Sequence, residues 1–274
     1  MLCLGHIEYS NCFPVHAALL DRGPPPGVTL HSDIPGNLNR ALAAGAVDVA
    51  PCSSIELARH TPRYRILPGL VIGSDGPVRS IRFESTLALE DLGGATVAVP
   101  TASATSVVLL RILLQSRHGV AARLRWFDQA RERDPVGAGA DAALWIGDRA
   151  LTRHIPARRR VYDLGAEWTA WTGLPFAFAV WQTPLGPEHD QELAGLHELL
   201  LASRAYFFEH AAALAERHAP AFGLPSDTLL TYWLSLRYEL DGRMRLGLLE
   251  FFRRAAELGL APPLERLPMV PTSA

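Results

Sequence analysis

Lysine is missing from the whole chain of 274 residues, so all 26 basic residues are arginine. A Walker A phosphate loop and a pyridoxal-phosphate Schiff base both need lysine, so both are excluded, together with every lysine nucleophile. Acidic and basic residues nearly balance at a net charge of −2, which leaves no basic field of the kind that binds nucleic acid or an anionic membrane. We therefore expect no nucleic-acid or membrane partner.

Cysteine is scarce: the chain has three, Cys3, Cys12 and Cys52, and they form neither a CxxC pair nor a disulfide framework. This pattern is typical of a reducing compartment. The first residues lack the charged and apolar segments of a signal peptide, and no stretch of about 18 apolar residues occurs. We expect a cytoplasmic protein without a membrane span.

The motifs of several enzyme classes are missing as well. HExxH, GxSxG and GxGxxG are absent, and the ten histidines show no metal-ligand spacing, so we expect no metal and no cofactor. The basic run of His154 with residues 158–160 is interpreted as a solvated surface. The aromatic segment 168–176 is interpreted as core or lobe-interface packing.

Apolar strands and amphipathic helices alternate through the first 180 residues, and a hydrophobic content of 49% is ample for a core. Strands are expected at 2–7, 28–31 and 47–50, each followed by a helix, which predicts a parallel sheet. A second α/β series starts near residue 89, and the chain after about residue 190 has helical periodicity. We predict an α/β protein with a first lobe at 1–86 plus 180–274, an inserted second lobe at 87–179, and a ligand cleft between them.

Ligands in such folds bind at the carboxyl ends of strands, which singles out the strand-to-helix junctions. Asn11 follows the first strand, where its amide either hydrogen-bonds a ligand or shapes the turn. Ser53 and Ser54 stand at a helix start, where free N–H groups attract a carboxylate or a phosphate. Helix capping explains one of these serines equally well.

The segment 101–106 places four hydroxyl residues at another helix start, more than a single cap needs. Anion binding and capping both remain open for this junction. In the turn 74–80, Arg79 either contacts a ligand or forms a surface pair with Asp75. Together these junctions suit a small dianionic ligand. The candidate binding residues in the two segments are Arg79, Ser103, Ala104, Thr105 and Ser106.

A series of short motifs runs through the chain in a fixed order. They include residues 9–14, VDVAPCSSIE at 47–56, SDGPVRS at 74–80, 104–107, ALWIGD at 143–148 and WTGLPF at 171–176. Together they resemble the MqnA family, the chorismate dehydratases of the futalosine route to menaquinone. The resemblance covers about residues 4–182 and adds Gly147 and Asp148 to the substrate-binding residues. Family members commonly have Leu where this chain has Ser10.

The resemblance implies a two-lobed, periplasmic-binding-protein-like fold of the two-crossover type, with mixed, mostly parallel sheets, working here as a cytoplasmic enzyme. It also implies that chorismate loses water to give 3-[(1-carboxyvinyl)oxy]benzoate. From its position directly after the first strand, we predict Asn11 as the catalytic residue. Elimination removes the C3 proton and the C4 hydroxyl, yet asparagine, serine and threonine are poor bases. We hypothesise that the enolpyruvyl carboxylate of the substrate is the base. Glu8, Asp75 and Asp148 remain candidate protein acids or bases.

Two other functions stay open. The sister enzyme of the same pathway, which makes 1,4-dihydroxy-6-naphthoate, shares the fold but has His followed by Glu where this chain has Gly147 and Asp148. A non-enzymatic small-anion-binding protein of a transporter or sensor is the second alternative, and it would need an export signal. A homodimer through apolar faces of the C-terminal helices is also conceivable.

Overall fold

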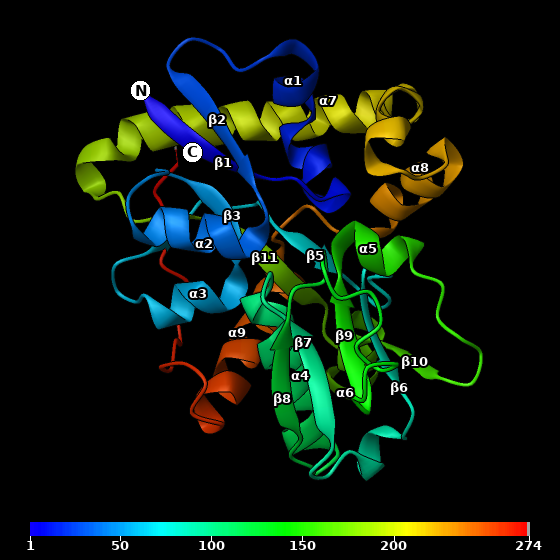
Figure 1. Cartoon of the computed structure of the whole chain (residues 1–274). Coiled ribbons are helices and arrows are strands. Elements are labelled where there is room, and N and C mark those ends of the chain that lie inside the picture. The colour runs from blue at the N-terminus through cyan, green and yellow to red at the C-terminus, as the bar shows by residue number, and fades with distance from the viewer. Residues whose placement is uncertain (273–274) are drawn as a thin grey trace.

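The computed structural model describes residues 1–272, and its strands fall into two groups (Figure 1). The first group, which we call the first lobe, contains a parallel pair β1–β2 and an antiparallel sheet in which β11 pairs with three short strands. All eight residues of β11 are buried, as expected for a central strand with apolar side chains on both faces. The strands of this lobe are β1 (Leu2–Ile7), β2 (Val28–Asp33), β3 (Ala50–Ser53), β4 (Arg65–Ile66), β5 (Ile72–Ser74) and β11 (Phe176–Thr183).

The second lobe is built on one five-stranded sheet in the order β10-β6-β9-β7-β8. β6 is antiparallel to both of its neighbours, whereas β7 runs parallel to β8 and β9, so the sheet is mixed. Figure 1 shows this sheet, in green and cyan, below the first lobe. Its strands are β6 (Ile81–Ser85), β7 (Thr96–Pro100), β8 (Arg123–Phe127), β9 (Ala142–Ile146) and β10 (Arg160–Asp163).

Helices cover the sheets and fill the last third of the chain. The long helix α7 lies alongside α1 and ends at Gly223, which adopts the left-handed conformation that favours glycine (Figure 1). No helix within residues 1–272 has the length and apolar character to cross a bilayer. The helices are α1 (Phe13–Arg22), α2 (Pro35–Ala43), α3 (Ser54–Arg59), α4 (Ala104–Ile112), α5 (Gly147–Thr152), α6 (Leu164–Thr172), α7 (Asp190–Phe222), α8 (Ser226–Ser235) and α9 (Gly242–Glu257).

Most predicted elements are present, with local differences. The strand predicted at 47–50 is displaced to Ala50–Ser53, because Val49 makes only an isolated bridge to Leu4 and pairing with β11 begins at Ala50. α5, β10 and α6 were not predicted.

Sheet pairing also moves both predicted lobe boundaries. Residues 81–85, assigned from sequence to the first lobe, pair as β6 with the second-lobe strands, and residues 176–179 belong to β11 of the first lobe. The chain therefore crosses just before each of these strands rather than within or after it.

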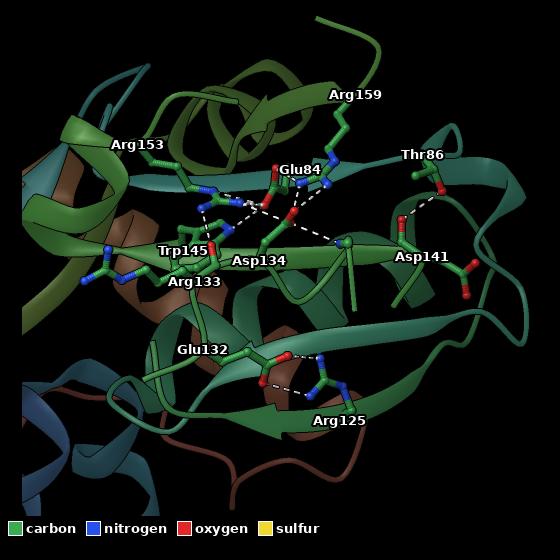
Figure 2. Close-up of polar contacts among 11 residues, drawn as sticks. Glu84, Thr86, Arg125, Glu132, Arg133, Asp134, Asp141, Trp145, Arg153 and Arg159 are labelled. Carbon is green, nitrogen blue, oxygen red and sulfur yellow. Dashed lines mark hydrogen bonds and ion pairs between the residues drawn. The ribbon is translucent and has the colours of Figure 1, made fainter. Parts of the chain in front are cut away.

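A buried ion cluster corrects the interpretation of the basic run as solvated at one position, Arg159, whereas His154, Arg158 and Arg160 are exposed as predicted. The Arg159 side chain is only 2% exposed, and its guanidinium donates to Glu84 at 3.1 Å and to Asp134 at 2.7 Å (Figure 2). Glu84, fully buried on β6, also accepts from Arg153 and from the indole N–H of Trp145, each at 2.7 Å. Two counter-charges, the buried Glu84 and the half-exposed Asp134, hold Arg159 in the lobe, and neither is close to it in the sequence.

Candidate functional site

A cavity lies between the two lobes, at the carboxyl ends of strands from both. The first lobe contributes residues after β1, at the end of β3 and on β11, and the second contributes the start of α4 and the end of β9. A binding site is expected at this position in a two-lobed α/β fold. The lining residues are Ile7, Tyr9, Asn11, Pro35, Ser53, Ile72, Ile81, Ser103, Ser106, Ile146, Gly147, Phe178 and Ala179.

Asn11 lines this cavity, as predicted for its position. Its side chain follows β1 in the short 3₁₀ turn Ser10–Cys12, and its Oδ1 atom is buried without a hydrogen-bond partner. A buried acceptor without a donor is costly to a fold, and a ligand that supplies a hydroxyl or N–H would satisfy it. Asn11 is therefore the strongest candidate for direct contact with a substrate.

The two serines at the start of α3 have different surroundings. Ser53 lines the cavity, and its amide donates to Asn39 Oδ1 at 3.1 Å. Ser54 is fully buried, and its hydroxyl donates to the Ala177 carbonyl at 2.8 Å, which fixes α3 to β11. The structure therefore brings Ser53 to the site and leaves Ser54 in the core.

The hydroxyls near the start of α4 also divide. Ser103 is the N-cap, since its Oγ accepts from the Ser106 amide at 3.3 Å, and both serines line the cavity. Thr105 Oγ1 instead accepts from the Ile55 amide at 3.1 Å and so joins α4 to the start of α3 across the lobes. Ala104 lines a separate outer crevice. Of the four hydroxyl residues in this segment, Ser103 therefore caps the helix and Thr105 makes a contact between the lobes.

Arg79 and Asp75 lie outside the cavity lining. Arg79 is exposed, has a left-handed backbone with φ of 64°, and donates its amide to Asp163 at 2.6 Å. Asp75 pairs with Arg243 at 2.9 Å rather than with Arg79. The predicted local Asp–Arg pair is wrong, because Arg243 on α9 is the partner that the fold brings to Asp75.

The junction after β9 meets the junction after β1. Gly147 lines the cavity with φ of 63°, and a Cβ atom there would lie 2.6 Å from the Tyr9 ring. Asp148 lies just behind the lining, where its carboxylate accepts from the Ser10 amide at 3.0 Å and from the Ser10 hydroxyl. Burial raises the pKa of Asp148, and the bonds from Ser10 oppose that rise.

The cavity is uncharged and mostly apolar, with a few polar side chains. Among the described residues that line it, the polar side chains are Tyr9, Asn11 and three serines, and none carries a formal charge. Burial raises the pKa of Tyr9 to about 12, so its phenol is neutral and accepts from Gln129 Nε2 at 3.2 Å. The site offers neutral hydrogen-bond donors and the start of α4 to a negative ligand.

Sequence reasoning missed Tyr9 and Gln129. Tyr9 stands in the quoted segment 9–14, directly between a strand and a turn, which was the available signal. Gln129 carried no such signal, because its role follows from bonds to the backbone N–H and C=O of Ile146 at 3.2 Å each.

Within residues 1–272, one group of possible metal ligands occurs, outside the cavity lining. Ligand atoms of His6, Cys12 and His16 lie within 4.8 Å of one another in the first lobe, a proximity that the sequence spacing did not indicate. The Trp181 indole N–H donates to His16 Nε2 at 3.0 Å, so the neutral His16 ring carries its proton on Nδ1 and donates to His6 Nδ1 at 3.0 Å. With its acceptor nitrogen occupied, His16 has no lone pair left for a metal, and the pair is a satisfied hydrogen-bonded unit.

Comparison with known proteins identifies the family. Residues 2–257 match a family model described as menaquinone biosynthesis. The chain belongs to this family. A curated member, the chorismate dehydratase of Thermus thermophilus, is 32% identical over 275 residues, which covers 94% of this chain and 96% of that protein. The resemblance predicted from the motifs is confirmed, and it extends through the C-terminal helices of this menaquinone-biosynthesis family member.

Solved structures confirm the predicted fold class. A protein of Archaeoglobus fulgidus superposes with a TM-score of 0.74 at 16% identity, covering 94% of this chain and 98% of that one. The alkanesulfonate-binding protein of Xanthomonas axonopodis superposes with a TM-score of 0.70 at 14% identity, covering 97% and 96%. The family member thus has the two-lobed fold of periplasmic binding proteins.

Proposed function

We propose that this protein is a chorismate dehydratase, which converts chorismate to 3-[(1-carboxyvinyl)oxy]benzoate in menaquinone biosynthesis. Two observations together support this proposal. The chain is similar over nearly its full length to a chorismate dehydratase, and the cavity between its lobes is uncharged and is lined by Asn11. Chorismate has two carboxylates and a cyclohexadiene ring, and the cavity combines amide and hydroxyl groups with the apolar walls Ile72, Ile146 and Phe178.

The base is the enolpyruvyl carboxylate of the substrate itself. It takes the C3 proton through a six-membered arrangement, the C4–O bond breaks, and the departing hydroxide takes up that proton to leave as water. The surroundings of the three protein acids support this assignment, since Glu8 is exposed, Asp75 is paired with Arg243, and Asp148 is occupied by Ser10. None of the three belongs to the described cavity lining.

Asn11 orients the reacting groups. Its Nδ2 group donates to the carboxylate base, and its unpaired Oδ1 accepts from the C4 hydroxyl before departure. Ser53, Ser103 and Ser106 hold the remaining carboxylate oxygens at the start of α4 and the end of β3. Dry surroundings strengthen these bonds, because water no longer competes for them.

The direct test is incubation of purified protein with chorismate, followed by chromatography and mass measurement of the products. Loss of one water with appearance of the aromatic ether supports the proposal. Unchanged chorismate, together with formation of 1,4-dihydroxy-6-naphthoate from the sister enzyme's substrate, would assign the other reaction. Tight binding of chorismate without any turnover would instead support a binding protein.

Variants at Asn11 test its role. Asn11→Ala should lower kcat by about a hundredfold or more while thermal unfolding changes little, because the lost bonds act on the reacting atoms. Asn11→Asp keeps the shape but places another negative charge beside a dianion, so both binding and turnover should weaken. If the Ala variant is less stable but keeps its kcat, Asn11 only shapes the turn and has no catalytic role.

Location and assembly are also proposed. All three cysteines are free thiols, two of them buried, which supports the reducing cytoplasm and is testable by cell fractionation. A homodimer through α8 and α9, where Leu234 is 52% and Leu246 is 58% exposed, is testable by sedimentation.

A further inference from the structure

The residue just before Asn11 is held by the opposite lobe. The Ser10 amide donates to both carboxylate oxygens of Asp148, at 3.0 and 3.2 Å, and the Ser10 hydroxyl donates to the same carboxylate. Ser10 lies in the first lobe after β1, whereas Asp148 lies in the first turn of α5 in the second lobe. The contact therefore joins the two lobes directly.

The other side of Ser10 is fixed within its own lobe. Its carbonyl accepts from the Trp233 indole N–H at 2.7 Å, and Ser10 is fully buried. The peptide group before Ser10 is thus held by Asp148 and the one after it by Trp233. Asn11 begins at that second peptide group, so the direction of its side chain depends on both contacts.

Neighbouring contacts make the same connection. The Tyr9 phenol accepts from Gln129 Nε2 at 3.2 Å, and the Tyr9 ring packs so closely on Gly147 that no side chain fits between them. The Gln129 side chain in turn donates to the Ile146 carbonyl and accepts from the Ile146 amide. The end of β9 and the turn after β1 therefore form one packed junction when the lobes are closed.

We propose that Asp148 is a positioning residue, which grips Ser10 across the lobe interface and thereby sets Asn11 against the bound substrate. The proposal rests on the dehydratase function and on the role of Asn11 given above. It differs from the sequence-based assignment of Asp148 as a substrate ligand or a base, because the carboxylate is occupied by two donors of Ser10, its amide and its hydroxyl. A desolvated carboxylate needs such donors, and only the closed lobes supply them.

Kinetics of single and double variants test the positioning role. Asp148→Ala should lower kcat about fiftyfold with a smaller change in KM, because the groups that react are misaligned while the cavity walls remain. Asp148→Asn keeps one acceptor oxygen for the Ser10 amide and should recover part of the rate. In an Asn11→Ala background, Asp148→Ala should cost less than about threefold further, since its effect passes through Asn11.

Asp48→Ala is the matched control. Its carboxylate also accepts a backbone amide, that of Cys3 at 2.7 Å, but both residues lie within the first lobe and away from the cavity lining. This variant should lose stability and keep kcat. The positioning role is wrong if Asp148→Ala keeps kcat and only unfolds earlier, or if its full loss of rate persists in the Asn11→Ala background.

Amide hydrogen exchange supplies a readout that needs no turnover. In the wild type with the aromatic ether product bound, the Ser10 amide should be protected, and Asp148→Ala should lose at least about tenfold of that protection. Unchanged exchange would overturn the proposal. A wild type that fails to dehydrate chorismate marks failure of the proposed function, whereas an active wild type with an equally active Asp148→Ala variant marks failure of the positioning role alone.

Discussion

Glu84→Gln should destabilise the second lobe far more than a surface change of the same type. The Glu84 carboxylate is fully buried, and it faces the guanidinium groups of Arg153 and Arg159, whose side chains are 14% and 2% exposed. Glutamine nearly preserves the shape but removes the charge and one acceptor. Both arginines are then left with Asp134 as their shared acidic partner (Figure 2).

The magnitude follows from burial. Removing one partner of a buried ion pair costs about 3–5 kcal/mol, and the half-exposed Asp134 compensates the two arginines only in part. A change of 1 kcal/mol lowers the melting temperature of a chain near this size by about 2–4 °C, so the expected decrease is about 6–20 °C. Glu132→Gln is the control, since Glu132 pairs with Arg125 at 2.7 Å but the two side chains are 30% and 39% exposed. A surface pair of that kind contributes about 1 kcal/mol or less.

Thermal and urea unfolding of the two variants would measure the difference. Turnover of chorismate by folded Glu84→Gln protein should be preserved well below its melting temperature, because the cluster does not line the cavity. A destabilisation within about 1 kcal/mol of the Glu132→Gln value would refute the reasoning. Replacing Glu84, Arg153 and Arg159 together by apolar residues of similar volume should recover much of the lost stability, since no buried charge is then left alone.

Three further predictions concern lobe closure and pH. Gly147→Ala should lower kcat/KM by about tenfold or more, because its Cβ would lie 2.6 Å from the Tyr9 ring; unchanged steady-state kinetics would contradict this. Thr105→Val removes the acceptor of the Ile55 amide at similar volume and should raise KM by about tenfold, with a moderate decrease in melting temperature because a buried N–H loses its partner; an unchanged KM would contradict the contact between the lobes. Burial lowers the pKa of His6 to about 4, so the unfolded chain binds the proton first as the pH falls below 6.5. The stability present above that pH should therefore decline by about 2 kcal/mol between pH 7 and pH 5 in urea titrations, and a flat profile would argue against a buried neutral His6.

The sequence predicted those parts of the fold that apolar patterning controls. β9 belongs to the second α/β series that the sequence predicts after residue 89, and its run of buried apolar residues is bounded by Asp141 and Gly147. Arg159 shows where that reasoning ends. An arginine between two other arginines is predicted to be exposed to solvent. Its partner Glu84 lies 75 residues earlier in the chain, so the sequence pattern does not reveal the pair. Only the pairing of the strands in the folded sheet places the Glu84 carboxylate beside Arg159.

The site shows the same division between local and distant information. The strand-to-helix junctions were predictable, and Asn11, Ser53, Ser103, Ser106 and Gly147 line the cavity as expected. Their immediate neighbours were not distinguishable from them, since Ser53 and Ser54 are identical residues at one helix start. Which of two adjacent hydroxyls faces the cavity depends on acceptors such as the Ala177 carbonyl, which is 123 positions away.

The missing lysine and the uncharged cavity have a common chemical consequence for the proposed reaction. A cation beside the enolpyruvyl carboxylate would bind it more firmly but would also lower its pKa and weaken it as a base. On the proposed mechanism, neutral donors such as Asn11 and Ser106 would orient the carboxylate without that penalty, and exclusion of water would raise its pKa further. Asp148 fits the same arrangement, because its carboxylate lies behind the lining and accepts hydrogen bonds from Ser10 rather than facing the substrate. The cavity therefore has the composition expected of a site where the substrate brings its own base and the protein supplies orientation and dryness.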